Sequence, residues 1–125
     1  MLRIGPAGYP EGSKTPADAV RKVSEAGLDA LEVQFVRDVR FNPERAEEAR
    51  REAEARGVTL SVHAPYYINL NSASQATVGK SEAWALRAMR GAEAFGAWIV
   101  VVHAAMYGDD REGATRNVIG ALRRI

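Results

Sequence analysis

Cysteine is absent from the 125-residue chain, and this absence removes several kinds of chemistry at once. Without thiols there can be no disulfide framework, no thiolate metal site and no cysteine nucleophile. Any metal ion must therefore be held by histidine, aspartate or glutamate side chains.

The chain also lacks a long apolar run and a large excess of charge of one sign. No segment approaches the roughly 18 consecutive apolar residues of a membrane-spanning helix, and the first residues contain no apolar signal core. Seventeen basic residues stand against sixteen acidic ones, which gives a net charge of +1. We therefore expect a cytoplasmic protein without membrane contact, and the charge of the whole chain does not indicate nucleic acid. The hydrophobic content of 46% is ordinary for one globular domain.

What the chain does contain is a repeat. Gly27, Gly57 and Gly96 each follow a helix-like segment and precede a short apolar run. Each glycine fits the position just after a helix C-terminus. The runs, rich in apolar and β-branched residues, predict strands buried on both faces of a parallel sheet. With a first strand ahead of them, the predicted strands cover residues 2–4, 28–33, 58–63 and 97–103.

Helical segments separate these strands. The first begins with Thr15 as N-cap and Pro16 at the first helical position, and the others are predicted over 43–56, 78–95 and 112–124. Apolar residues at helical spacing are expected to face the sheet. They are Ala19, Val20, Val23, Ala46, Ala49, Ala53, Ala85, Met89, Ala92, Phe95, Ala114, Val118, Ile119 and Leu122.

Strand and helix alternate four times, which indicates an α/β fold of parallel βα repeats. A doubly wound dinucleotide-binding domain has little support. The first strand is followed by Gly5-Pro6-Ala7-Gly8 and not by a Gly-x-Gly-x-x-Gly sequence. A full (β/α)8 barrel has about 250 residues. Residues 1–125 are therefore predicted to be a single domain of four βα units, the (βα)4 first half of a TIM barrel.

The chain has two histidines, and each closes a predicted strand: His63 ends one apolar run and His103 ends the next. Ligands gather at the carboxyl ends of parallel strands, and neighbouring strands lie about 5 Å apart. If these strands are neighbours, the two imidazoles can share one metal ion. The alternative is that each is a lone, hydrogen-bonded strand-end residue.

Aromatic and basic side chains follow two of the strands. Tyr66 comes soon after His63, where it either stacks on a base or sugar or only covers the barrel mouth. Arg37 and Arg40 follow the second strand. They either grip phosphates through their guanidinium groups or form ion pairs within the protein, with Asp38 or Glu32 as partner.

These residues resemble a known family. The first of the matching segments is His63-Ala64-Pro65-Tyr66-Tyr67-Ile68-Asn69-Leu70. It resembles the His-x-x-Tyr-x-Ile-Asn-Leu motif of the endonuclease IV family of apurinic/apyrimidinic endonucleases. Residues 35–40 are similar to that family's second-strand loop, and Val102-His103 is similar to its fourth-strand histidine. The resemblance covers the whole chain in order, but only the first half of a family member.

The resemblance implies a DNA-repair enzyme of the (β/α)8 barrel fold, in which a three-zinc cluster hydrolyses the phosphodiester 5′ to an abasic site. By this resemblance His63 and His103 are ligands of one zinc ion. Tyr66 and Arg40, or Arg37 in place of Arg40, contact the double-stranded DNA that carries the abasic site. Zinc generates hydroxide at neutral pH and neutralises charge on the phosphate.

Two departures from the family limit what the resemblance implies. The residues after His103 are Ala104-Ala105-Met106-Tyr107-Gly108, where the family usually has Pro-Gly. The family's further zinc ligands, on strands five to eight, have no positions in this chain. A complete three-zinc site therefore cannot form within one copy, and we expect the chain alone to lack efficient nuclease activity.

Two other functions are compatible with the sequence. One is a non-catalytic half-barrel module that self-associates, because its first and fourth strands leave open edges. A two-fold homodimer would then close the barrel. The other is a metal-dependent sugar isomerase or epimerase of similar architecture, against which the stretch Tyr66-Tyr67-Ile68-Asn69-Leu70 argues.

Overall fold

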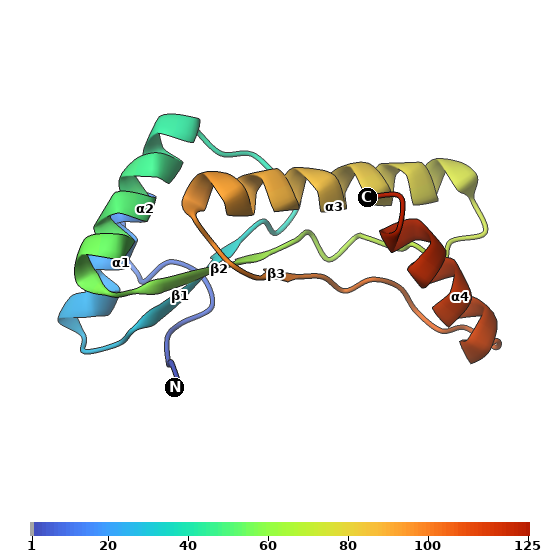
Figure 1. The fold of residues 1–125 in the computed structure, drawn as a ribbon, viewed down its shortest axis with the longest axis horizontal. Coiled ribbons are helices and arrows are strands. Elements are labelled where there is room, and N and C mark those ends of the chain that lie inside the picture. The colour runs from blue at the N-terminus through green and yellow to red at the C-terminus, as the bar shows by residue number, and fades with distance from the viewer. Residues whose placement is uncertain (1) are drawn as a thin grey trace.

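A computed structural model describes residues 2–125, in which strands and helices alternate (Figure 1). In chain order the elements are α1 (Pro16–Glu25), β1 (Ala30–Gln34), α2 (Pro43–Arg56), β2 (Thr59–His63), α3 (Gln75–Phe95), β3 (Val100–Val101) and α4 (Arg111–Leu122). The strands form one parallel sheet in the order β1-β2-β3. This arrangement confirms the predicted α/β fold of parallel βα repeats.

Polar residues determine where the helices begin. Each helix follows a residue whose side chain accepts a hydrogen bond from the backbone N–H three residues further on; these residues are Thr15, Asn42, Ser74 and Asp110. The bond satisfies one of the free N–H groups at a helix N-terminus. Because Ser74 is the cap, α3 begins at Gln75 and not at residue 78 as predicted. The apolar stripe that suggested the later start begins one turn inside the helix.

The first predicted strand, residues 2–4, is not a regular strand in the structure. The parallel pairing lies slightly later, over residues 4–8. The carbonyl of Pro6 accepts a hydrogen bond from the N–H of Glu32 in β1 at 3.0 Å, and Ala7 forms a parallel bridge with the same residue. This segment occupies the place of a first barrel strand, but Pro6 has no N–H to continue the ladder.

The strand before α4 is shorter than predicted. Only Val100 and Val101 of the expected run 97–103 form regular strand. In the register with β2, Val62 pairs with Val100 and His63 pairs with Val101. The outer edge of β3 has no strand partner within residues 2–125, so β3 is paired with a neighbouring strand on one side only.

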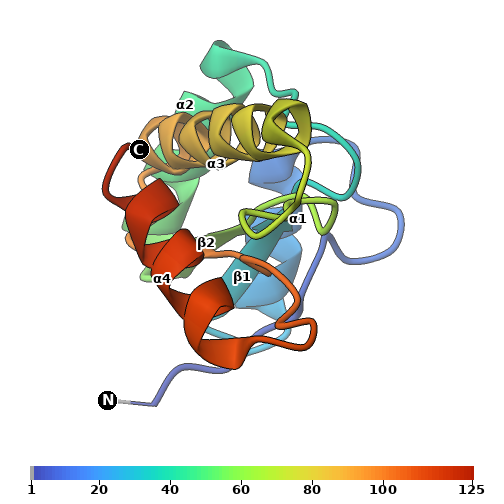
Figure 2. The same ribbon diagram turned by 90° about the vertical axis from the view of Figure 1, so that its right-hand side faces the viewer.

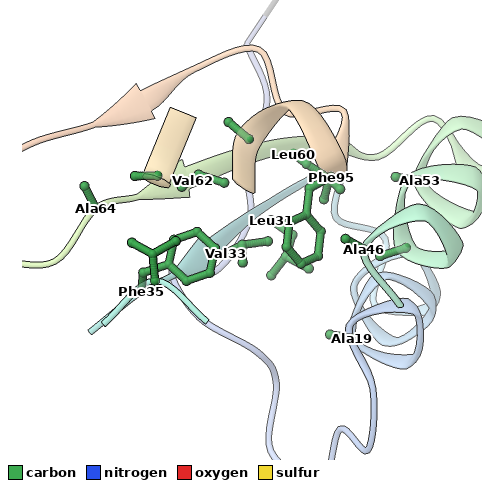
Figure 3. Packing of buried hydrophobic residues seen from close by; sticks show 14 of the residues in the cluster. Ala19, Leu31, Val33, Phe35, Ala46, Ala53, Leu60, Val62, Ala64 and Phe95 are labelled. Atoms are coloured by element: carbon green, nitrogen blue, oxygen red, sulfur yellow. The ribbon is translucent and has the colours of Figure 1, made fainter. Parts of the chain in front are cut away.

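The core lies between the sheet and the helices α1, α2 and α3. Side chains alternate along a strand, and the buried set on this face is Leu31, Val33, Leu60 and Val62. Phe95 of α3 is 2% exposed and packs among them (Figure 3). The helix α2 contributes only the alanine stripe Ala46, Ala49 and Ala53, whose small side chains permit a close approach.

No helix of residues 2–125 covers the opposite face of the sheet, so the expectation of burial on both faces is wrong for this structure. Helices α2, α3 and α4 form an arc on one side of the strands, like half of a barrel wall (Figure 2). On the uncovered side Ile99 is 40% exposed and Val101 38%, and Trp98, just ahead of β3, is 74% exposed. Apolar strand residues that would fill a closed barrel therefore face solvent. No helix within residues 2–125 is long and apolar enough to cross a membrane.

Three helix residues expected to face the core are exposed instead: Met89, Ile119 and Leu122. On α3 the buried stripe includes Ala85, Ala88 and Ala92, so Met89 points away from it. Within the described part of the chain α4 contacts no helix or strand other than α3, so much of its surface has no neighbour. Helical spacing alone cannot distinguish an apolar helix face that is covered by other elements from one that has no packing partner.

The close approach of α3 to the sheet can be tested at Gly91. A Cβ there would lie 2.8 Å from Cε2 of Phe35. We expect Gly91→Ala to lower the free energy of unfolding by about 1–3 kcal/mol, because it overpacks the core. Gly79→Ala, at an open position of the same helix, should raise it by about 0.5–1 kcal/mol. Urea unfolding measures both, and a stabilising Gly91→Ala would contradict this packing.

Candidate metal centre

His63 and His103 lie at the carboxyl ends of adjacent strands. His63 is the last residue of β2, and its neighbour in β3 is Val101. His103 follows two residues later and so projects from the same face. The centroids of the two imidazole rings are 5.0 Å apart, with the ring planes inclined by 42°. The structure thus brings together the two histidines that the sequence singles out, while metal binding itself stays a prediction.

A backbone hydrogen bond sets the tautomer of His63. Its Nδ1 atom lies 2.8 Å from the carbonyl oxygen of Ala64. A carbonyl oxygen only accepts, so Nδ1 carries the proton and donates it. Nε2 of the neutral ring then keeps its lone pair, which is the form of imidazole that binds a metal ion. His63 is partly buried and His103 is exposed, so solvent reaches the pair.

The pleat of β1 decides the direction of Glu32, which the sequence leaves open. Leu31 and Val33 are buried beneath the helices, so Glu32 and Gln34 project from the opposite face, the side of the histidines. Gln34 lies beside His63 in the register. Within residues 2–125, no group of three or more metal-ligating side chains is placed to hold an ion. Glu32 therefore does not complete a three-ligand site in this structure.

In the loop after β1, Asp38 pairs with two arginines. Nε of Arg40 donates to Oδ2 of Asp38 at 2.8 Å, and Nη1 of Arg87 lies 3.6 Å from Oδ1. Arg40 thus forms the intramolecular ion pair considered above. Arg37 is exposed and makes no ion pair with any residue of the described range 2–125. Arg37 is therefore the cation of this loop that stays available to a ligand.

The ion pair changes the acidity of Asp38. The hydrogen bond from Arg40 is the main reason why the pKa of the Asp38 carboxyl lies below its ordinary value. Partial burial, the next largest effect, acts in the opposite direction, while the backbone N–H of Val39 and the charges of Arg40 and Arg87 lower the pKa further. The carboxylate therefore stays charged at neutral pH and holds Arg40 beside the barrel mouth.

Tyr66 is 53% exposed and does not stand alone. Its hydroxyl donates to that of Tyr67 at 2.9 Å, and the ring centroids are 4.3 Å apart. This hydrogen bond raises the pKa of Tyr66, because ionisation would remove the donated proton, and the charge of Arg37 acts in the opposite direction. The ring of Tyr67 in turn lies 6.5 Å from that of Trp84 on α3. Sequence reasoning missed Trp84, since nothing in the spacing links it to this loop.

The rest of the motif anchors the loop after β2. Ile68 and Leu70 are buried in the core. The hydroxyl of Ser81, fully buried in α3, accepts a hydrogen bond from the N–H of Asn69 at 2.9 Å. The N–H of Leu70 donates to the carbonyl of Ala104 in the loop after β3 at 2.8 Å. A serine in the middle of a helix is the sequence signal that could have revealed this anchor.

The fold and the paired strand ends define one half of a βα barrel with a candidate ligand site at its mouth. Residues 20–125 match the family model of the xylose isomerase-like TIM barrel. The chain belongs to this family. An uncharacterised protein of Methanocaldococcus jannaschii is 33% identical over 81 residues, which are 65% of this chain and 29% of that protein.

Solved structures extend the likeness over nearly the whole chain. Endonuclease IV from Thermus thermophilus has a TM-score of 0.75 and 27% identity, over 98% of this chain and 47% of that one. A 3-keto-D-glucoside 4-epimerase from E. coli has a TM-score of 0.72 and 15% identity, over 99% of this chain and 50% of that one. D-psicose 3-epimerase from Clostridium cellulolyticum has a TM-score of 0.67 and 17% identity, over 86% of this chain and 40% of that one.

These comparisons confirm the resemblance to endonuclease IV, and they show that the fold is shared more widely. At 15% and 17% identity the two epimerases show the fold alone. The chain spans about half the length of the solved structures it matches, or less. Any activity of the whole barrel is therefore a matter of proposal for this chain.

The donor set suits zinc in kind but not in number. Neutral imidazole is a favoured zinc ligand, and the tautomer of His63 presents a lone pair at Nε2. A catalytic zinc ion takes about three protein ligands, whereas residues 2–125 place two imidazoles together. The two imidazoles can supply two ligands to an ion, which is one fewer than a catalytic zinc site usually has.

The ion pair beside the mouth can be tested by titration. Arg40→Gln should raise the pKa of Asp38 towards its ordinary value, because the main stabilising hydrogen bond to the carboxylate is lost. Arg37→Gln, in the same loop, should leave it nearly unchanged. Carbon-detected NMR of the Asp38 carboxyl measures both variants. Equal shifts in the two variants would contradict the assignment of Arg40 as the partner.

Proposed function

We propose that this chain carries the first half of an endonuclease IV-like site for zinc-dependent hydrolysis of the phosphodiester 5′ to an abasic site in DNA. One observation supports the proposal most directly. Two imidazoles lie 5.0 Å apart at the mouth of a half barrel that is 27% identical to an endonuclease IV over 98% of its length. The nuclease is favoured over a sugar epimerase because the epimerases share only the fold.

In this proposal His63 and His103 are ligands of the same zinc ion. The hydrogen bond from Nδ1 to the Ala64 carbonyl fixes the ring of His63 and leaves Nε2 available. When bound, zinc supplies hydroxide at neutral pH and neutralises charge on the phosphate. His103 is the more exposed of the two, so an ion can reach its ring from solvent.

Tyr66 and the arginines of the loop after β1 are proposed to contact the damaged duplex. Tyr66 is exposed and follows His63 closely in sequence, and its hydroxyl is held by Tyr67. The family resemblance favours Arg40 for the phosphate contact, with Arg37 as the alternative. Because Arg40 is engaged by Asp38, we place Arg37 in this role. An abasic sugar has no base to unpair, so its extrusion costs less than that of a normal nucleotide.

We further propose that residues 1–125 form one (βα)4 domain and that a second half of similar size closes the barrel. The chain exposes 8043 Å². A folded monomer of 13.6 kDa typically exposes about 6,600 Å². The excess of about 1,400 Å² is larger than the roughly 800 Å² that one partner loses in a standard interface. A second copy of this chain, related by a two-fold axis, would supply such a half.

The metal proposal predicts zinc in the purified protein. His63→Ala and His103→Ala should each lose the bound zinc, because one imidazole alone is a weak site. Asp109→Asn should retain it, since this exposed carboxylate lies outside the histidine pair. Elemental analysis of a light-scattering-defined peak measures the metal content, and zinc that persists in His63→Ala would contradict the assignment.

The same proposal predicts that the 125-residue chain cuts abasic duplex DNA poorly, because the described residues offer two ligands and not a complete set. An assay of incision with and without zinc measures this. Rapid zinc-dependent incision by the purified chain would show that two histidines, or two copies, suffice.

The association proposal predicts a mass of twice 13.6 kDa in light scattering at micromolar concentration. Ile99→Lys, on the uncovered face, should shift the equilibrium towards the monomer, because the new charge would be buried in the contact. Leu86→Lys, on the outer side of α3, is the matched control and should leave the mass unchanged. A wild-type protein that is only monomeric would count against closure by a second copy.

A further inference from the structure

The loop after β3 carries His103 and leads to α4, and it has little buried apolar surface to hold it. Ala104 packs partly against the core, but none of residues 103–113 is buried, and Met106 is 83% exposed. Burial of apolar surface is the dominant favourable contribution to folding. Because this loop buries so little, its course, and with it the place of the His103 ring, depends on hydrogen bonds.

Two hydrogen bonds join this loop to the loop after β2. The backbone N–H of Leu70 donates to the carbonyl oxygen of Ala104 at 2.8 Å. The side chain of Asn71 donates through Nδ2 to the carbonyl oxygen of Met106 at 3.0 Å. Together they continue the contact of β2 with β3 beyond the regular strands. The second bond uses a side chain where a strand would use its backbone N–H.

The side-chain amide of Asn71 is held at both of its polar atoms. The carbonyl oxygen of Met106 only accepts, so the NH2 group must face it and Oδ1 must face the other way. On that side Nδ2 of Asn117 in α4 donates to Oδ1 of Asn71 at 2.9 Å. The backbone N–H of Asn71 also donates to Oδ1 of Asn69 at 3.1 Å. A relay of two amides, Asn117 to Asn71 to Met106, thus connects α4 with both loops.

The relay gives α4 a contact that its packing does not supply. Among the helices and strands of residues 2–125, α4 contacts α3 alone. That contact includes the ion pair of Arg124 with Glu82 at the end of α4. Asn117, in the middle of α4, instead points to the loop after β2 through its bond to Asn71. The relay therefore ties the helix that follows the His103 loop back to the loop that follows His63.

We propose that Asn71 and Asn117 are positioning residues of the candidate metal centre. Asn71 holds the His103 loop through the carbonyl of Met106, and Asn117 fixes the amide of Asn71. The imidazoles of His63 and His103 are thereby kept at a centroid distance of 5.0 Å. Displacing one ring would leave a single ligand for an ion. The role towards zinc rests on the proposed function, and both asparagines lie outside the segment 63–70 that carries the family resemblance.

Zinc affinity tests the relay. Asn71→Ala should weaken zinc binding about tenfold, the lower end of what residues that orient metal ligands contribute. Asn117→Ala should weaken it less, and the double variant should be no weaker than Asn71→Ala, because Asn117 acts through Asn71. Asn117→Gln keeps an NH2 donor on an exposed side chain and should restore the affinity. Competition with a chromophoric zinc chelator measures all four variants.

Ser72→Ala is the matched control in the same loop. It removes the hydrogen bond from the N–H of Ser74 to the Ser72 hydroxyl, at 3.2 Å, and does not touch the relay. Its zinc affinity should equal that of the wild type. Equal losses in Ser72→Ala and Asn71→Ala, with circular dichroism showing both folded, would overturn the proposal. Losses that simply add in the double variant would overturn the role of Asn117.

A second measurement needs no metal. In the presence of EDTA, the N–H of Leu70 should exchange with deuterium about two- to tenfold faster in Asn71→Ala than in the wild type, because its bond to Ala104 lies next to the lost contact. The N–H of Asn69 is bonded to Ser81 of α3 and serves as the internal control, with an unchanged rate. Hydrogen exchange followed by NMR measures both groups.

The two measurements separate the relay from the metal centre. If the wild type binds zinc, and Asn71→Ala binds it as tightly with an unchanged exchange rate at Leu70, the relay is wrong and the metal proposal stands. If the wild type binds no zinc but the exchange of Leu70 accelerates in Asn71→Ala, the metal centre is wrong and the relay holds the loop for another purpose. An unchanged Leu70 rate in a protein without zinc would overturn both.

Discussion

The parallel pairing of β2 with β3 is the constraint on which the candidate centre depends. The register sets His63 beside Val101, and the period of two along a strand then places His103 on the same face. A slip of one residue would turn one imidazole towards the helices and separate the pair. The register is fixed in turn by Val62, which is fully buried under α3 and cannot exchange places with a polar neighbour.

The same alternation divides each strand into a covered and an uncovered side. Leu31, Val33 and Leu60 meet the helices, whereas the residues between them face the open side of the half barrel. On that open side Gln34, His63 and His103 lie at or just beyond the carboxyl ends of the three strands. The mouth of the half barrel is therefore polar, and this is the end at which TIM barrels carry their sites.

The segment that resembles endonuclease IV performs two kinds of task. Ile68 and Leu70 are buried, and the N–H of Asn69 bonds to Ser81, so this part of the motif holds the loop in place. His63 and Tyr66 remain accessible at the mouth. Part of this motif is therefore scaffold, and its accessible residues form the candidate site. Here the identity of 27% to one endonuclease IV supports the scaffold directly and leaves the chemistry to experiment.

Local periodicity and capping residues were enough to predict the βα alternation, the approximate helix starts and the position of both histidines at strand ends, because these features depend on near neighbours in the chain. They could not predict the direction of Glu32, the exposure of Met89 and Ile119, or whether Arg40 pairs with Asp38 or with Glu32. Those depend on the pleat register, on which helix faces have neighbours and on the contact of Arg40 with Asp38. Only the folded chain decides them, because each is a contact, or a missing contact, that its three-dimensional course creates.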